Sequence, residues 1–584
     1  MELDGGTAAC VVASRLSDAS PSLSILVIEN GTDSADDPAV RYPALGFGNF
    51  LPTSNLTLFY ESVTEPSTND RRIVVPSGGT LGGGSAINML TYSRAQRTDF
   101  EAWKTPGWGA DDLLPLMKKI ETYHGPGSAG VHGDSGPLQV SASTYVVPET
   151  EETFIAAAAG RGWPEAVDIQ DFETVNASQK NLRYITKEGK RSDAAEAYLR
   201  PRVKDGKHPR LQVLVEHQVA RVLFEGTRAT GVEVRSNPKF QPDATGTKTI
   251  KARKLVVVSC GALGTPLVLE RSGVGSPEVL AEAGVEVVAE IPGVGNQYLD
   301  HHLHVHPYRT SLNPEQTADA LFTGRRDVGA LLAANDPILG WNLADVVAKL
   351  RPTEADVAAM VPAARTVWDR DYKDDPSRSL AIVTLLSAFP HDPTTVPPGQ
   401  YITTSTFTTY PLSRGHLHIT GPKVDDAPDF ATGFLSDEAG ADIEACAWAY
   451  KTQREIVRRM PVYRGEVAAY HPPFAASSGA VCIETEEPLP ADVPDLVYSA
   501  EDDVVLAKWL RETVASTWHS MGTCKMAPKE AGGVVDETLG VYGVEGLKIA
   551  DLSIAPGNVG ANTGNTAFVV GEKAAEIFIA ELGL

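Results

Sequence analysis

The sequence predicts an α/β protein with two lobes: a Rossmann-like, doubly wound lobe and an α+β lobe built on an antiparallel sheet. The chain has 584 residues, which is enough for two large lobes with separate cores. At its start a glycine loop, a helix pattern and an apolar strand pattern follow one another, as in a doubly wound sheet. Later segments such as 415–420 alternate apolar and polar residues, which is typical of antiparallel strands.

Composition and charge argue against several classes of protein. Asp and Glu total 75 against 51 Lys and Arg, so the formal net charge is −24, and nucleic acid or an anionic membrane surface would repel the chain. Five cysteines do not make a disulfide framework, so a reducing compartment fits better. No stretch approaches the ~20 apolar residues of a membrane span, and the polar, glycine-rich start is not typical of a signal peptide. We therefore expect a cytoplasmic protein without nucleic-acid or membrane partners.

The start of the chain carries the pattern of a dinucleotide-binding unit. Gly5, Gly6 and Thr7 lead into a helix pattern, and an apolar strand pattern follows and ends in Glu29. Glycines let the backbone approach a pyrophosphate, the helix N-terminus attracts it, and the terminal acid can hydrogen-bond a ribose. This order of elements matches the second half of a βαβ dinucleotide-binding unit.

Two parts of that unit are expected to be missing. The usual G-x-G-x-x-G fingerprint would run from Asp4 to Ala9, and this segment lacks the first and the last glycine. Only three residues precede Asp4, so the first strand of the unit is also expected to be missing. Losing a central strand should cost more than the few kcal/mol of a typical point mutation. We therefore hypothesise that the start of the given chain is incomplete.

Further elements are expected along the chain. Segment 77–88 holds a second group of five glycines, which suits a close approach of the backbone to a ligand. Apolar runs predict strands at 211–215, at 232–234 and, buried in a parallel sheet, at 255–258. A capping box at 499–502 predicts the start of a helix, and a last helix is expected from about residue 565.

Two C-terminal segments carry polar groups suited to catalysis: 516–524, which contains His519, and 549–563, which contains Asp551 and Asn562. A histidine beside a tryptophan, taken by itself, favours a packed core residue. Together with the other motifs, however, the chain resembles the glucose–methanol–choline (GMC) family of FAD-dependent oxidoreductases, and within it the alcohol (methanol) oxidases of fungi and yeasts. The resemblance covers nearly the whole chain, through segments 75–88, 189–199, 259–273, 294–301, 410–415 and the two C-terminal ones.

The resemblance implies a fold in which both lobes are assembled from separated pieces of the chain. Residues 1–145, 185–300 and 534–584 would form an FAD-binding domain, and residues 146–184 and 301–533 a substrate-binding domain. The implied reaction is oxidation of a primary alcohol, short-chain or somewhat larger, to an aldehyde, with O2 reduced to hydrogen peroxide. The implied ligands are FAD, a small-molecule alcohol and O2, and assembly into a homo-oligomer stays open.

The resemblance also assigns roles to individual residues. His519 would be the general base that takes the hydroxyl proton, and the near-neutral pKa of histidine suits that role. Asn562 would hydrogen-bond the alcohol oxygen without competing for its proton. Ile87 stands where some relatives carry a histidine bonded covalently to FAD, so non-covalent FAD is expected. Cofactor contacts are implied for Gly5, Gly6, Thr7, Glu29, Thr80, Gly82, Gly83, Asn88, Val219, Trp518, Asp551 and Thr563.

The substrate pocket is expected at Met89, Thr91 and Trp518. Met89 and Thr91 stand where methanol-specific relatives carry larger residues, so alcohols larger than methanol are expected. The chain ends in Glu-Leu-Gly-Leu, without the peroxisomal tripeptide of the methanol oxidases, so a peroxisomal address is not expected.

Other functions stay open at the level of sequence. The same fold could serve a dehydrogenase with another electron acceptor, a lyase, a photodecarboxylase or a non-catalytic binding protein. His302, His304 and His306 would share one face of a strand and could ligate zinc or copper, but no cysteine or carboxylate completes the set, so no metal is expected. Segment 133–136 resembles a serine-protease nucleophile segment, but no partner histidine motif accompanies it, and we predict a surface turn.

Overall fold

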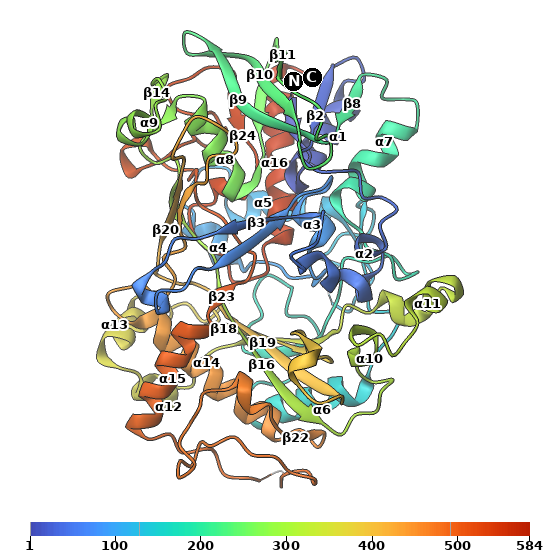
Figure 1. Cartoon of the computed structure of the whole chain (residues 1–584), viewed down its shortest axis with the longest axis vertical. Helices are drawn as coiled ribbons and strands as arrows, with labels where there is room; N and C mark the ends of the chain where they lie inside the picture. The colour runs from blue at the N-terminus through green and yellow to red at the C-terminus, as the bar shows by residue number, and fades with distance from the viewer. Residues whose placement is uncertain (1, 128, 491) are drawn as a thin grey trace.

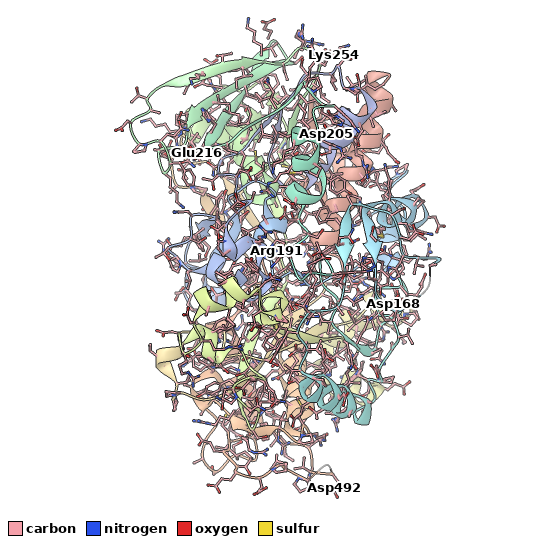
Figure 2. The ribbon with its side chains drawn as sticks, turned by 90° about the vertical axis from the view of Figure 1, so that its right-hand side faces the viewer. Asp168, Arg191, Asp205, Glu216, Lys254 and Asp492 are labelled. Atoms are coloured by element: carbon pink, nitrogen blue, oxygen red, sulfur yellow. The ribbon has the colours of Figure 1, made fainter. Side chains whose placement is uncertain are left out.

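The computed structural model describes residues 2–127, 129–490 and 492–584. The molecule is elongated, with two lobes stacked along its long axis and both chain termini at the upper end (Figure 1). Figure 2 labels Lys254 near that end, Asp492 at the opposite end and Arg191 between them. We call the lobe with the five-stranded sheet the upper lobe and the lobe with the seven-stranded sheet the lower lobe.

The upper lobe is built on a parallel sheet of five strands. In spatial order these are β24 (Leu547–Ile549), β12 (Val256–Val258), β1 (Glu2–Asp4), β2 (Ile25–Ile28) and β8 (Leu211–Leu214). Neighbouring strands are parallel throughout, so residues from the start, the middle and the end of the sequence lie side by side. Buried parallel strands of this kind are covered on both faces by helices.

The prediction that the first strand is missing is wrong. Glu2–Asp4 forms β1 at the centre of the sheet, where Leu3 lies opposite Val27 of β2 and Glu2 opposite Val256 of β12. Three residues are enough to pair with both neighbours, because the chain leaves the sheet at Gly5 and enters α1 (Thr7–Ala19) directly. The preceding run was too short to show a strand pattern in the sequence, and only its neighbours in space reveal it.

The last helix, α16 (Gly564–Leu582), packs against α1. It begins within a residue of the predicted start and brings the C-terminus beside the N-terminal helix, as Figure 1 shows. A Cβ on Gly571 would lie 2.8 Å from that of Val11, so this glycine permits the close approach. Arg15 of α1 adds an ion pair to Glu572 at 2.7 Å.

The lower lobe is built on an antiparallel sheet. Its strands are, in spatial order, β22 (Tyr463–Glu466), β16 (His302–Thr310), β19 (Tyr401–Thr408), β18 (Ala381–Leu386), β17 (Ala344–Leu350) and β7 (Ala177–Lys180), with β23 (Ala515–Ser516) pairing with β16. The alternating segment 415–420 does form a strand, β20 (Gly415–His418), but it belongs to a separate three-stranded sheet with β15 (Asn296–Tyr298) and β21 (Asp429–Ala431).

The remaining elements surround these sheets. One smaller sheet consists of β9 (His217–Glu225), β10 (Arg228–Ser236) and β11 (Thr247–Lys251), and another of β3 (Thr57–Glu61) and β4 (Val74–Gly78). The longer helices are α5 (Ala110–Ile120), α6 (Pro148–Gly160), α8 (Gly261–Arg271), α14 (Ala441–Arg458) and α15 (Ala500–Thr513). The predicted capping box is confirmed, since Ser499 Oγ accepts from the backbone N–H of Asp502 and the Asp502 carboxylate accepts from that of Ser499. Within the described residues, no helix is both long and apolar enough to cross a membrane.

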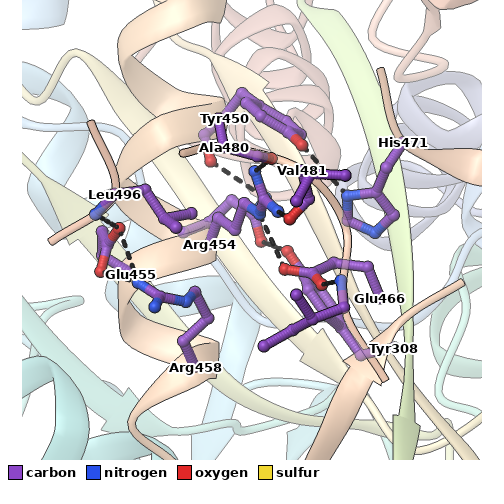
Figure 3. A network of polar contacts seen from close by, with 12 residues as sticks. Tyr308, Tyr450, Arg454, Glu455, Arg458, Glu466, His471, Ala480, Val481 and Leu496 are labelled. Atoms are coloured by element: carbon purple, nitrogen blue, oxygen red, sulfur yellow. Dashed lines mark hydrogen bonds and ion pairs between the residues drawn. The ribbon is translucent and has the colours of Figure 1, made fainter. Parts of the chain in front are cut away.

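A buried polar network fixes α14 against the lower sheet (Figure 3). Arg454 of α14 donates to the Glu466 carboxylate of β22 at 2.8 Å and to the carbonyl oxygen of Ala480 at 2.8 Å. Both charged side chains are almost fully buried, so loss of either partner would leave an uncompensated charge in the interior. The sheet that faces the upper lobe therefore has a rigid backing.

Candidate active site

A cavity of about 610 Å³ lies between the two lobes. Its upper part is lined by the start of α1, the end of β2, the second glycine-rich segment and the start of α8. Its lower part is lined by residues of β16, β18 and β19. Of the residues named from the sequence, Gly6, Thr7, Glu29, Gly83, Asn88, Met89, Thr91, Val219, Trp518, His519, Asp551, Asn562 and Thr563 line this cavity.

The start of α1 gives one end of the cavity a character that suits an anion. The first turn of the helix carries no acidic residue and no side-chain cap, and Gly6 and Thr7 line the cavity there. Backbone N–H groups at such a helix start attract a phosphate group. Glu29, at the end of the neighbouring strand, lines the same end and accepts a hydrogen bond from the backbone N–H of Gly31 at 2.7 Å.

Gly83 lets the second glycine-rich segment cross the first one closely. Its φ is +55°, a left-handed conformation that favours glycine, and a Cβ there would lie 2.9 Å from the Cα of Gly6. No side chain fits between the two segments, so bare backbone lines the cavity at this point. Such a surface suits close approach of a flat or phosphate-bearing ligand.

Gly5, Thr80 and Gly82 lie behind the cavity wall. The backbone N–H of Gly82 donates to the carbonyl oxygen of Gly5 at 2.8 Å, which ties the two glycine segments together. Thr80 Oγ1 donates to the carbonyl oxygen of Thr32 at 2.7 Å and is fully buried. These three residues shape the wall without lining the cavity.

Asp551 holds the start of α8 at the cavity. Its carboxylate accepts from the backbone N–H of Gly261 at 3.0 Å and from Thr265 Oγ1 at 2.6 Å, and burial raises its pKa. Val219 of β9 lines the cavity nearby. A carboxylate with these partners positions the backbone that faces the ligand.

Asn88 and Thr563 flank the region nearest the lower lobe. The side-chain oxygen of Asn88 accepts from Arg191 Nη1 at 2.9 Å and from the backbone N–H of Leu90 at 3.0 Å. Ile87, beside it, lines the cavity with an apolar side chain, and Thr563 stands at the start of α16. This helix start also lacks an acidic residue and a side-chain cap, so it offers a second positive end to the ligand.

His519 and Asn562 come together where the upper cavity meets the lower sheet. The Nε2 atom of His519 lies 3.3 Å from Nδ2 of Asn562, and its Nδ1 atom lies 2.8 Å from Nδ1 of His301. Burial, reinforced by His301, lowers the pKa of His519 well below its usual range. Burial also lowers the pKa of His301 to about 3, so both rings are neutral at pH 7.

The tautomer of His519 follows from the orientation of the Asn562 amide, whose nitrogen is placed toward the ring. The amide nitrogen of Asn562 can only donate, so Nε2 of His519 carries the lone pair that faces it. The proton of the ring then resides on Nδ1, which donates to the unprotonated Nδ1 of His301. His519 therefore presents a basic nitrogen beside the Asn562 amide, at the wall of the cavity.

Asp300 holds both histidines in place. Its carboxylate accepts from the backbone N–H groups of His301 at 2.7 Å and of His519 at 3.1 Å, and from the hydroxyls of Ser516 at 2.5 Å and Tyr298 at 2.9 Å. Burial raises the pKa of Asp300 to about 6. Four donors on one buried carboxylate fix the segment that carries His519.

Aromatic side chains enclose the space around His519. Trp518 stacks on Phe50 with ring centroids 4.1 Å apart, and the backbone of Trp518 is left-handed, with a φ of +62°. Phe407 of β19 contacts His519 edge to face, with ring centroids 5.3 Å apart. Together with Met89 these rings give the region of His519 a predominantly apolar lining.

The sequence did not single out four residues of this site. His301 and Asp300 belong to a short motif that the resemblance already contained, and their position just before β16 was the available signal. Phe50 and Phe407 carried no signal, because an aromatic residue in a helix or a strand is usually part of a core. Strand pairing and loop packing bring these residues to the site.

The row of histidines on β16 lies outside the cavity. His302, His304 and His306 share one face of the strand, as expected, and all three are buried. Among the residues that the structure describes, no group of three or more His, Cys, Asp or Glu side chains is arranged to hold a metal ion.

The cavity fits the FAD that the resemblance implies. Bare glycine backbone and an uncapped helix start suit a pyrophosphate, and the Glu29 carboxylate suits a ribose. The buried oxygen of Asn562 lacks a partner within the described part of the chain, as expected of a group that faces a polar ligand.

Comparison with known proteins gives the same family. The chain matches the family described as GMC oxidoreductase over residues 3–307, and its C-terminal counterpart over residues 411–571. It is 36% identical to the alcohol oxidase of Candida boidinii and 35% identical to that of Pichia angusta, and each alignment covers 99% of this chain and 94% of the relative.

A solved structure has the same fold. The FAD-dependent oxidoreductase from Chaetomium thermophilum superposes with a TM-score of 0.82 at 24% identity, covering 100% of this chain and 99% of that one. The predicted combination of a doubly wound lobe with an antiparallel lobe is thereby confirmed. The two family matches and the near-full-length relatives point to the same family, and the cavity fits its cofactor FAD. The chain therefore belongs to the GMC oxidoreductase family of FAD-dependent enzymes.

Proposed function

We propose that the protein oxidises a primary alcohol to an aldehyde and passes the electrons to O2, forming hydrogen peroxide. The observation that carries the proposal is the pair of His519 Nε2 and Asn562 Nδ2, 3.3 Å apart at the cavity wall where the FAD cradle meets the lower sheet. The relatives named alcohol oxidase, at 36 and 35% identity, support the choice of an alcohol as substrate.

His519 acts as the general base. The alcohol hydroxyl takes the place of the Asn562 N–H in front of the Nε2 lone pair, and the neutral ring accepts its proton as the carbon is oxidised. The depressed pKa of His519 keeps this lone pair free of a proton at neutral pH. His301 and Asp300 hold the ring and its tautomer in place.

Asn562 binds the oxygen of the alcohol. One N–H of its amide faces His519, and the other N–H is available to the oxygen that becomes negative as the proton leaves. FAD would supply the acceptor for the hydride that leaves the alcohol carbon, and O2 would be the final acceptor of the two electrons. The overall reaction balances as alcohol plus O2 giving aldehyde plus hydrogen peroxide.

We further infer how the chain divides between cofactor and substrate. Residues 1–145, 185–300 and 534–584 form the FAD-binding domain, and residues 146–184 and 301–533 the substrate-binding domain. FAD is held without a covalent bond, because the apolar Ile87 occupies the wall position where some relatives carry a histidine. Met89, Thr91 and Trp518 bound the pocket for an alcohol larger than methanol.

The experiment is anaerobic mixing of the FAD-loaded protein with ethanol, 1-butanol and benzyl alcohol, followed by admission of air. The flavin absorbance should bleach with alcohol and recover with air, with one peroxide formed per aldehyde. In His519→Gln the rate of bleaching should fall by about 10²- to 10⁴-fold while the bound FAD remains, because only the base is lost. Acid precipitation should release all the flavin from the protein.

Different outcomes point to the alternatives. Bleaching without recovery in air, but with recovery upon addition of a quinone, identifies a dehydrogenase. Bound FAD that no alcohol bleaches excludes alcohol oxidation and favours a lyase or a photodecarboxylase. A protein that binds no FAD would be a non-catalytic member of the fold.

A further inference from the structure

We propose that the cavity contains a second polar subsite on the lower sheet, formed by Thr384, Ser405 and His391, which binds an oxygen atom several carbons away from the reacting hydroxyl. The substrate class is then a neutral diol or polyol, or an alcohol with a distal ether oxygen. This inference rests on the proposed function and names its substrate class.

Strand geometry places the subsite two residues along β19 from Phe407, the residue of that strand that contacts His519. On β19 both Phe407 and Ser405 line the cavity, and the Phe407 ring contacts His519. Residues two apart on a strand lie on the same face about 7 Å apart, so Ser405 stands about that far along the sheet from Phe407. Thr384 of β18 is paired directly with Ser405, which sets two hydroxyls side by side.

These hydroxyls are free to bind a ligand. Within the described residues, neither Ser405 Oγ nor Thr384 Oγ1 has a hydrogen-bond partner, and both side chains are half-buried at the cavity wall. On the same face of β19, two residues from Ser405, the hydroxyl of Thr403 by contrast donates to the carbonyl oxygen of Ala388 at 2.6 Å. Polar groups at a buried wall usually find partners, so two free neighbours at one point indicate a ligand position.

His391 extends the subsite farther from His519. It follows β18, whose last residue Leu386 pairs with Thr403, two residues beyond Ser405 on β19. The His391 ring lies against Tyr470, with centroids 4.6 Å apart, and its buried Nε2 atom has no partner among the described residues. Burial lowers the pKa of His391 to about 4, so the ring is neutral at pH 7 and can exchange hydrogen bonds with a hydroxyl.

The lining between the two ends defines the rest of the ligand. The lower sheet contributes Leu303, Val305 and Leu386 to the cavity, so carbon atoms of the substrate lie on an apolar surface. β16, β18 and β19 contribute no Asp, Glu, Lys or Arg to the lining. A charged distal group would therefore be desolvated without a counter-charge, which favours a neutral oxygen.

The test compares diols with alkanols of equal length on the FAD-loaded enzyme. The measured quantity is the ratio of kcat/KM for 1,4-butanediol over 1-butanol, repeated with the six- and eight-carbon pairs. A diol has two reactive ends, so a ratio of about 2 means no recognition of the distal hydroxyl. We expect a ratio of about 6 to 20 for at least one length, because one or more uncharged hydrogen bonds contribute about 3- to 10-fold.

Variants assign the effect to the subsite. Thr384→Val, which removes a hydroxyl at constant volume, and Ser405→Ala should each lower the ratio toward 2, and His391→Phe should do so for the longer diols. Thr384→Ser keeps a hydroxyl and should keep the ratio. Thr366→Val, on the exposed face of helix α13 (Pro362–Asp371), is the matched control and should change kcat/KM for neither the diol nor the alkanol.

The outcomes separate the two proposals. Oxidation of alcohols with a ratio of about 2 at every length overturns the subsite and leaves the proposed function standing. A high ratio that survives both Thr384→Val and Ser405→Ala also overturns it, since the recognition then lies elsewhere. Bound FAD that no alcohol bleaches overturns the proposed function itself.

Discussion

At the scale of single residues, the orientation of the His519 ring depends on the hydrogen bond of its Nδ1 atom, on the side of the ring away from Asn562. Its Nδ1 proton has one partner, Nδ1 of His301, and the lone pair on Nε2 faces Asn562. Removing the rear partner leaves a buried N–H unsatisfied and lets the ring change tautomer. His301 is therefore a positioning residue for the proposed base.

Substitution of His301 tests this dependence. His301→Ala should lower kcat/KM for ethanol by about 10- to 100-fold, because a buried unsatisfied N–H costs about 1–3 kcal/mol. His301→Asn offers a carbonyl oxygen near the position of Nδ1 and should recover most of the rate. FAD content, measured by absorbance, is the control for folding, and equal rates in the two variants would contradict the positioning role.

The pH dependence of the rate tests the base itself. The pKa of His519 lies well below 6.5, so the neutral, proton-accepting form persists as the pH falls. We expect kcat/KM to stay level from pH 8 down to about pH 6.5 and to decline only in more acidic buffer. Steady-state rates across that range check this, and a decline centred at pH 6.5 or above would show an unperturbed base.

At the scale of elements, β16 carries a row of buried histidines. Burial lowers the pKa of His302 and of His304 to about 3 in each case, and the pKa of His306 falls well below its usual range. Arg414 and Arg71 add to the shifts of the first two. The strand therefore folds with neutral imidazoles.

This row should make the protein sensitive to acid. In the unfolded chain each histidine binds a proton near pH 6.5, whereas folded His302 and His304 stay neutral down to about pH 3, so stability falls as the pH drops through that window. At pH 5 each such histidine costs about 2 kcal/mol. Urea unfolding at pH 7 and at pH 5 should show a loss of several kcal/mol.

A matched pair of variants isolates the contribution of the strand. His304→Leu removes a ring whose Nε2 has no partner among the described residues and should reduce the loss between pH 7 and pH 5 by about 2 kcal/mol. His416→Leu changes a histidine on β20 that is only partly buried, and should leave the loss close to that of the unsubstituted protein. An identical loss in all three proteins would refute the assignment.

At the scale of the whole molecule, the segment that carries Met89 and Thr91 is bound to the lower lobe. Lys349 of β17 donates to the carbonyl oxygen of Arg94 at 3.0 Å and to the side-chain oxygen of Gln96 at 2.7 Å. Burial lowers the pKa of Lys349 to about 8, and the group is charged at pH 7. These bonds tie the pocket wall to the large sheet.

Loss of these bonds should weaken the molecule as a whole. Lys349→Met leaves two buried oxygens without their donor and should lower the free energy of unfolding of the FAD-loaded protein by about 1–3 kcal/mol. Urea unfolding followed by tryptophan fluorescence measures this. Lys373→Met, at an exposed lysine, is the control and should change the stability by less than about 0.5 kcal/mol. Equal stability of the two variants would show that the buried bonds contribute little.

Much of the fold and of the site follows from local sequence. The glycine loop, the helix after it, the capping box at Ser499 and the last helix each depend on residues close together in the chain, and each forms as predicted. The motifs around His519 and Asn562 indicated the family, and the structure brings these two side chains together. Local hydrogen bonding and backbone geometry suffice for such features, because their partners lie within a few residues.

The tertiary structure alone decided the rest. Glu2–Asp4 becomes the central strand only because β2 and β12 supply its hydrogen bonds, and no pattern in three residues shows this. His301 meets His519 across 218 residues. Thr384 and Ser405 form a pair only through the register of β18 and β19. The sequence by itself thus determined the family, whereas pairing between distant strands decided which polar groups are satisfied and which line the cavity.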